Sequence, residues 1–425
     1  MITEEFLHFI WQYQLINAAA FKTLKGEPIQ VIQAGTHNKN SGPDFSLAKI
    51  KINNTLWAGN IEIHVKTSDW IKHKHQYDKK YENLILHIVY ENDLSESDFQ
   101  QFNFPVAEIK GLIDTNLSEK YKNIIQHKGK IPCEQLIDGI DTFRFKSGLN
   151  RLAVERLQAK AEKVMALLQA NNNSWEETMY QFVARTFGLK INAEPFEKLA
   201  KRLPLKIIGK HKNNFNQIEA LLFGTAGLLN NNLNDDYGKN LHKEFQFLKA
   251  KYHLQPLEKH EWHFLRLRPA AFPTIRLAQF AKLLYESVHL FSKIKTNAEH
   301  KYIQQLFKVN VSDYWLTHYT FDTLSEKRNK SLGSSAINLV ILNAIVPVLF
   351  AYGQYTDNET IKENALQLLE NISAEKNSII KDWETIKYKA ENALESQALI
   401  QLRNEYCNKK RCLNCHVGTY MLKRT

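Results

Sequence analysis

The sequence has little of what marks secreted, repetitive or membrane proteins. Only four cysteines occur in 425 residues, and three of them lie together near the C-terminus, which does not fit a secreted disulfide framework. The first residues, MITEEFLHF, are acidic and amphipathic and lack the apolar core of a signal peptide. The longest apolar run, residues 336–352, is interrupted by Asn343 and Pro347 and predicts a buried helix. We therefore expect a cytoplasmic protein with no membrane partner.

Acidic residues are in deficit, because 45 Asp and Glu face 56 Lys and Arg, which gives a net charge of +11. An excess of positive charge favours anionic partners, and we expect nucleic acid, with DNA favoured. The length and the 44% hydrophobic content are sufficient for two or three domains with substantial cores.

Residues 60–66 alternate strictly between polar and apolar side chains, which predicts a half-buried strand. A second strand is expected over residues 45–52, after a Gly42-Pro43 turn, and the two would be joined at residues 53–54. Such a hairpin would bring Asp44 towards Glu62, where two carboxylates hold one divalent ion. The residues of the polar face are Asn60, Glu62, His64 and Lys66.

This pattern resembles the PD-(D/E)xK nuclease superfamily, in which Pro-Asp on one strand is followed by Glu-x-Lys on the next. Pro43 and Asp44 match the first half of the motif, and Glu62 matches the second carboxylate. His64 stands where the superfamily has its catalytic lysine, and Lys66 on the same face offers another cation. The resemblance implies a restriction-endonuclease-like domain with Mg²⁺ or Mn²⁺ at Asp44 and Glu62.

The elements expected around the hairpin agree with that core. A helix over residues 3–20 and a strand over 29–33 precede it, while a helix within 68–83 and a covered strand over 84–90 follow. The segment between them carries His73, His75 and Asp78, which could bind a transition metal. The alternative that we favour from the sequence is a solvated basic face, because no fourth ligand has suitable spacing. For His87 we expect a hydrogen-bonded place in the core.

From about residue 141 the period of the apolar residues changes to 3.6, which predicts an all-α domain. We expect one domain over residues 1–130 and a helical domain over 131–425. The helices are predicted at residues 143–170, 175–187, 193–202, 216–229, 241–251, 275–295, 337–352, 360–371 and 378–405.

Arginines in the helical part are candidates for phosphate binding. Arg266 and Arg268 lie on one side of a predicted extended segment, Arg276 opens the next helix, and Arg151 lies on the earlier long helix. The alternative is that these arginines pair with acidic residues and join helices.

The C-terminus carries Cys407, Cys412 and Cys415, followed directly by His416. Three thiols among basic, polar residues predict a structural metal, either zinc or an iron–sulfur cluster. The fourth ligand would be His416 or the distant Cys133, and Cys133 would tie the chain's end to the first domain. The arrangement resembles PD-(D/E)xK nucleases of recombination and CRISPR adaptation that hold an iron–sulfur cluster with one cysteine far from three others. A redox pair or plain structural thiols are the other alternative.

From EEFLHFIWQYQ through SGPDF, WAGNIEIH and LRLRPAAFPTIRLAQFA to YCNKKRCLNCHVG, the sequence resembles a bacterial family defined only as a domain of unknown function. The resemblance covers nearly the whole chain and implies no activity. The residues lead us to expect a magnesium-dependent DNase of α+β class. The alternatives are a non-catalytic nucleic-acid binder or scaffold with a degenerate site, and a metal hydrolase that acts on a small substrate.

Overall fold

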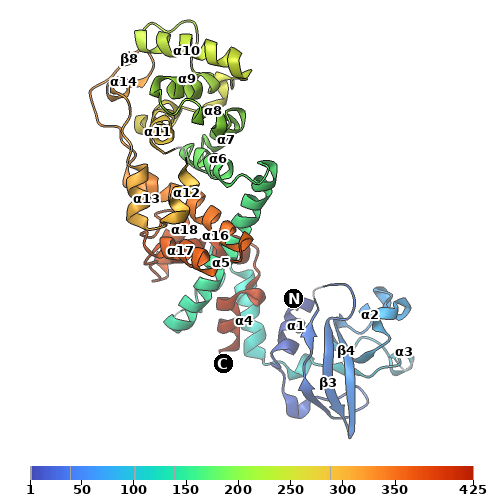
Figure 1. Cartoon of the computed structure of the whole chain (residues 1–425). Helices are drawn as coiled ribbons and strands as arrows, with labels where there is room; N and C mark the ends of the chain where they lie inside the picture. Colours follow the sequence, from blue (N-terminus) through green and yellow to red (C-terminus); the bar gives the residue numbers. More distant parts are fainter. Residues whose placement is uncertain (1, 39, 100–101, 138–139, 288, 425) are drawn as a thin grey trace. The chain divides into compact units, whose positions relative to one another are not determined.

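The computed structural model describes residues 2–38, 40–99, 102–137, 140–287 and 289–424. Its contacts divide the chain into two units (Figure 1). The N-terminal unit contains residues 1–148 together with 402–425, and the helical unit contains residues 149–401. The division therefore differs from the expected boundary after residue 130, since the last residues of the chain fold with the N-terminal unit.

The N-terminal unit is built on a mixed sheet with the order β1-β3-β4-β5-β6, in which β2 also pairs with β3. The pairs β1–β3 and β3–β4 are antiparallel, and β4–β5 and β5–β6 are parallel. Two of the strand predictions, residues 29–33 and 45–52, match the observed bounds. The strands are β1 Ile29–Gln33, β2 Thr36–His37, β3 Phe45–Ile52, β4 Thr55–Lys66, β5 Leu84–Glu91 and β6 Val106–Glu108.

Figure 1 shows α1 and α2 on opposite sides of β3 and β4. Both are shorter than predicted. The chain leaves the helical conformation after α1, where Gln14 has φ = 52°, and after α2, where Lys74 has φ = 60°. Two single 3₁₀ turns, η2 and η3, replace the rest of the second predicted helix. The helical segments are α1 Glu4–Gln12, α2 Asp69–Lys72, η2 His75–Tyr77, η3 Lys79–Tyr81, α3 Glu96–Phe99, α4 Thr115–Gln126 and α20 His416–Lys423.

The helical unit confirms the predicted change of period. Predicted helices 175–187 and 193–202 match the observed bounds, whereas 275–295 and 378–405 are each divided in two. A short hairpin, β7 His318–Thr320 with β8 Thr323–Leu324, interrupts the helices. The helices are α5 Thr142–Ala170, which begins in the N-terminal unit, α6 Trp175–Phe187, α7 Ala193–Arg202, α8 Leu205–Gly209, α9 Phe215–Thr225, α10 Asp236–Tyr252, α11 Pro273–Glu286, α12 Leu290–Thr296, α13 His300–Phe307, α14 Asp313–Leu316, α15 Ser334–Val340, α16 Val346–Tyr355, α17 Glu359–Glu370, α18 Ser378–Thr385 and α19 Ala393–Gln401.

One helical stretch, Ser334–Tyr355, is long and apolar enough to cross a membrane. Its most apolar part is 67% buried within the protein, as expected for a core helix. A π-helical turn at Ile341–Ile345 lies between α15 and α16, and Pro347 follows it in the first turn of α16. Among the described residues this is the one stretch that passes that test, and its burial is that of a core helix.

Candidate functional site

Asp44 and Glu62 interlock across the antiparallel strands β3 and β4. The backbone N–H of Asp44 donates to Glu62 Oε2 at 3.0 Å, and the backbone N–H of Ile63 donates to Asp44 Oδ2 at 2.9 Å. The backbone of β4 therefore holds the carboxylate of Asp44, and the backbone N–H of Asp44, just before β3, holds the carboxylate of Glu62. The side chain of Glu62 is 5% exposed and that of Asp44 is 21% exposed, so the pair lies at the edge of the interior.

Local backbone features explain why Asp44 reaches this position. Gly42 has φ = 111°, which side chains disfavour, and Pro43 then sets the entry to β3. The pairing of β3 with β4 shifts register between Phe45 and Ala48, as at a β-bulge, and bulges commonly re-aim side chains beside active sites. Gly59 permits close strand pairing, because a Cβ there would lie 2.5 Å from Ile85 Cγ2.

Helix α1 contributes a residue that sequence reasoning missed. His8 Nε2 lies 3.1 Å from Asp44 Oδ2, and the His8 side chain is 17% exposed. Its ring contacts His37 and Phe45 edge-on. The carboxyl group of Glu4, in the first turn of the same helix, has a raised pKa because it is partly buried. The apolar spacing of this helix predicted only a core-facing role, and no local motif distinguishes His8.

Four histidines gather on the inner face of β4 and β5. His64 Nδ1 lies 2.9 Å from His87 Nε2, and His64 Nε2 lies 3.1 Å from His73 Nδ1. His64 Nε2 and His75 Nε2 lie 3.5 and 3.4 Å from Glu62 Oε1. The ligand nitrogens of His64, His73 and His75 all lie within 4.8 Å of one another.

The exposed lysines and the exposed His73 agree with the solvated basic face that we favoured from the sequence, and the structure adds contacts of His73 and His75 with His64 and Glu62. His73 and His75 lie beside His64 because the short α2 and the turn at Lys74 bring them back over the sheet. Glu62, which the local spacing of the histidine segment did not indicate, comes from the sheet and lies 3.4 Å from His75 Nε2. His87 has the expected place in the core, where it is fully buried and hydrogen-bonded to His64.

The buried cluster carries little charge of its own. Burial, with the neighbouring carboxylate of Asp44, raises the pKa of Glu62 to about 9. Burial and the adjacent imidazoles, of which His87 has the largest effect, lower the pKa of His64 to about 2. Neutral imidazole nitrogens are the form that coordinates metal ions, and a bound cation would favour the carboxylate form of Glu62.

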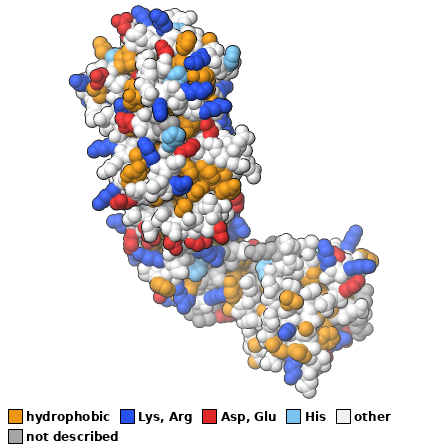
Figure 2. All heavy atoms as spheres, viewed as in Figure 1, with side chains coloured by type: hydrophobic (Ala, Val, Ile, Leu, Met, Phe, Trp, Pro, Cys, Tyr) orange, Lys and Arg blue, Asp and Glu red, His pale blue; other side chains and the backbone are white. Residues whose placement is uncertain are grey.

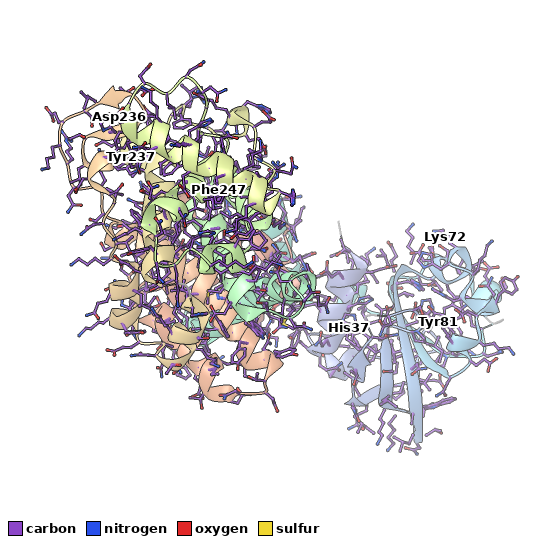
Figure 3. All side chains as sticks on the ribbon, turned by 45° about the horizontal axis from the view of Figure 1, so that its top comes forward. His37, Lys72, Tyr81, Asp236, Tyr237 and Phe247 are labelled. Atoms are coloured by element: carbon purple, nitrogen blue, oxygen red, sulfur yellow. The ribbon has the colours of Figure 1, made fainter. Side chains whose placement is uncertain are left out.

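The lysines of the same segment face outward, around the histidines. Lys72, Lys74, Lys79 and Lys80 are all exposed. Figure 3 shows Lys72 at the margin of the unit. The ring of Tyr81, which is labelled in the same view, lies 4.2 Å from the ring of His75, measured between centroids. Lys66 lies at the end of β4, where its ammonium is 4.0 Å from Asp93.

The last residues of the chain, which include Cys407, Cys412 and Cys415, fold with the N-terminal unit, which also contains Cys133. Lys120 Nζ donates to the carbonyl of Arg424 at 2.7 Å, and Asn414 donates to Glu5 at 2.8 Å. All four cysteines are buried and none forms a disulfide. Burial and the three other thiols raise the pKa of Cys133, so the four sulfurs are electrostatic neighbours.

His416 lies beside these cysteines in the sequence but has another partner. Its Nε2 lies 3.0 Å from the carbonyl oxygen of Arg144, and the residue is exposed. This hydrogen bond occupies Nε2 of His416 and leaves Nδ1 as its other donor atom. Of the two candidates for the fourth ligand, Cys133 is the one that the fold places with the other thiols.

The candidate arginines of the helical unit do not share one environment. Arg266 and Arg268 are exposed, and Arg266 has φ = 62°. Arg276 is largely enclosed and donates to Gln279 at 3.1 Å, and burial lowers its pKa. Arg151 is exposed on α5. In Figure 2, lysine and arginine side chains are spread along the helical unit rather than collected in one area.

The fold and the site define a two-unit α+β protein whose N-terminal sheet carries a buried cluster of histidines and carboxylates. A family model described as a protein of unknown function, DUF2851, matches residues 4–378, and the chain belongs to this family. The match confirms the expected membership in a domain-of-unknown-function family. No curated protein and no solved structure matches the chain.

Proposed function

We propose that the protein is a metal-dependent nuclease that cleaves DNA phosphodiesters in its N-terminal unit. The observation that carries the proposal is the interlocked pair of Asp44 and Glu62 on the neighbouring interior strands β3 and β4, where Asp44 is partly exposed. Two carboxylates on adjacent strands are the usual means of holding a hard divalent ion beside a phosphate.

The order of elements supports a PD-(D/E)xK nuclease. Helix α1, three antiparallel strands, the short helix α2 and the parallel strand β5 follow one another as that core requires. Asp44 precedes the second of the three strands and Glu62 lies on the third, which are the positions of the superfamily's two carboxylates.

Asp44 and Glu62 are the residues that would hold Mg²⁺ or Mn²⁺. Such an ion lowers the pKa of a bound water and stabilises the charge that develops on the phosphate. His8 Nε2 lies 3.1 Å from Asp44 Oδ2, so in this proposal His8 orients the Asp44 carboxylate. His64 is enclosed by His73 and His87, so in this proposal it positions Glu62 rather than replacing the superfamily's lysine.

The surroundings of the site suit a polyanionic substrate. The exposed lysines of the segment after β4 provide positive charge next to the carboxylates, and the whole chain carries a net charge of +11. Lys66 pairs with Asp93 and is a further cation at this edge. Arg151, Arg266 and Arg268 are exposed donors that would bind phosphates elsewhere along the substrate, whereas the enclosed Arg276 is less suited.

The four cysteines would hold a second, structural metal centre, either zinc or an iron–sulfur cluster. Four neighbouring buried thiols without a disulfide form a donor set that suits either group. Cys133 and the three C-terminal cysteines are far apart in sequence, so the centre would fix the chain's end to the N-terminal unit.

Cleavage of plasmid DNA tests the nuclease proposal. The purified full chain should cleave DNA with Mg²⁺ or Mn²⁺, and Asp44→Asn should reduce the rate by well over about a hundredfold. Glu119→Gln, which changes an exposed carboxylate on α4, serves as the control and should leave the rate unchanged. Salt-dependent DNA binding without cleavage under any divalent ion would refute catalysis and favour a non-catalytic binder.

A further inference from the structure

We infer that His64, His73, His75 and Glu62 form a site for a transition-metal ion of the zinc class, separate from the cysteines. The donor atoms are Nε2 of His64, Nδ1 of His73, Nε2 of His75 and Oε1 of Glu62. Three elements supply them: strand β4, the end of α2 and the turn η2.

The distances between the donor atoms match those around a single tetrahedral ion. With metal–ligand bonds of about 2.0–2.2 Å, neighbouring donors around tetrahedral zinc lie roughly 3.3–3.5 Å apart. The measured separations are 3.1 Å between His64 and His73, 3.5 Å between His64 and Glu62, and 3.4 Å between His75 and Glu62. These three of the six separations agree with one ion at the centre within about 0.3 Å, and the ligand nitrogens of the three histidines lie within 4.8 Å of one another.

The hydrogen bonds around the donors leave atoms that an ion would satisfy. Nε2 of His75 is buried and has no hydrogen-bond partner. Nε2 of His64 and Nδ1 of His73 share one hydrogen bond at 3.1 Å, and a bound cation would take the place of its proton. A buried polar atom without a partner costs free energy, and coordination of His75 Nε2 to that cation would remove the cost.

The surrounding residues fix the rings in the orientation that coordination needs. If His64 binds through Nε2, its proton lies on Nδ1 and is donated to His87 Nε2 at 2.9 Å, as is usual for metal-bound histidines. His75 is held between Tyr81 and Trp70, whose ring centroids lie 4.2 and 5.2 Å from its own. The rings are therefore placed by packing before any ion binds.

The donor set identifies the class of ion. Three imidazoles and one carboxylate suit zinc and its neighbours among the transition metals, whereas Mg²⁺ prefers oxygen donors in octahedral geometry. Glu62 directs Oε1 to the histidines and Oε2 to Asp44, so it could serve this ion and the proposed catalytic ion together. The site does not depend on the nuclease proposal, since it would also form in a protein that cleaves nothing.

Zinc content measured by mass spectrometry tests the inference. The full chain, dialysed against zinc and then against zinc-free buffer, should retain one zinc per chain more than His73→Gln does. His73 is exposed, so its substitution should leave folding intact. His260→Gln, at an exposed histidine of the helical unit, is the matched control and should retain as much zinc as the unchanged protein. Equal zinc in His73→Gln and the unchanged protein would overturn the inference.

Cobalt provides a second readout on the unchanged chain. Co²⁺ should give the visible absorption of a tetrahedral nitrogen and oxygen site that His73→Gln lacks, whether or not the thiolates add a near-ultraviolet charge-transfer band of their own. Zinc should abolish that absorption and excess Mg²⁺ should not. Absence of the absorption, or its loss in Mg²⁺, would contradict the site whether or not the protein cleaves DNA.

Discussion

The buried polar groups described below have complementary partners in the helical unit and partners of their own kind in the N-terminal unit. In the helical unit two buried charged residues, Glu219 and Lys330, meet groups of complementary kind. Ser312 donates to Glu219 at 3.0 Å, and the ammonium of Lys330 donates to the carbonyls of Trp315, Leu316 and His318 at 2.6 to 3.1 Å. Donors and acceptors match, so these groups are explained by the fold alone.

In the N-terminal unit, buried groups of the same kind face one another. Imidazoles face imidazoles around His64, and the three C-terminal thiols raise the pKa of the buried Cys133. Such clusters gain little from their own hydrogen bonds and would gain much from a cation. Buried polar groups alone therefore do not indicate a binding site, whereas a buried cluster of groups of the same kind does.

The largest expected effect comes from the residue shared by both proposed ions. Glu62→Ala should reduce DNA cleavage by well over about a hundredfold, because it removes a ligand that the transition state requires. The same variant should also bind less zinc than the unchanged protein. Glu219→Ala, at the buried glutamate of the helical unit, should leave zinc content unchanged. Loss of zinc in both variants would show that zinc binding is not specific to the cluster in the N-terminal unit.

The cysteine cluster should contribute strongly to stability. Cys412→Ser should release the metal and lower the melting temperature of the N-terminal unit by about 10 °C, because metal-binding energy becomes folding energy. Asn408→Ser, at an exposed neighbouring position, is the control. Scanning calorimetry with metal analysis makes the measurement. An unchanged metal content in Cys412→Ser would show that the thiols are only structural.

The helical unit should show ordinary proton linkage at Glu219. Burial raises the pKa of this carboxyl from 4.5 to about 7. Its contribution to stability is therefore fully present below pH 4.5 and is lost as the pH rises through 7. Between pH 4.5 and 8 the free energy of unfolding should fall by about 3 kcal/mol relative to Glu219→Gln, which cannot titrate. A difference in the free energy of unfolding between the two proteins that stays the same at all pH values would contradict this account.

The smallest effects are expected at the exposed arginines. Arg266→Ala and Arg268→Ala should each weaken DNA binding a few-fold and reduce the salt slope by about one. Arg328→Ala, at an exposed arginine paired with Glu326, is the control for loss of a single surface charge. Identical slopes for all three variants would show that the helical unit does not contact DNA at this segment.

Much of the sheet could be predicted because its signals are local. The alternation over residues 60–66 and the Gly42-Pro43 turn predicted the hairpin, and the structure brings Asp44 to Glu62 across it. The alternation did not show that the polar face is enclosed, since Glu62 and His64 are both buried. Polar residues in a strand usually face solvent, and only the covering segment decides otherwise.

The rest of the site depends on contacts between distant residues. The inward turn of His73 and His75 follows from the end of α2 and from packing on Trp70 and Tyr81, which no periodicity reveals. The contribution of His8 depends on how α1 lies on the sheet. The C-terminal cysteines were recognised by their spacing, but their place beside Cys133 comes from the folding of the tail onto the N-terminal unit.

The central claim is that the N-terminal unit holds one transition-metal centre at the histidines and another at the cysteines, in addition to the proposed Mg²⁺ or Mn²⁺ site. Anomalous diffraction from crystals of the full chain, with data at the zinc and iron absorption edges, tests it most directly. The account predicts one peak among His64, His73, His75 and Glu62 and a second among the four cysteines. No anomalous peak at the histidines in crystals grown with zinc would contradict it.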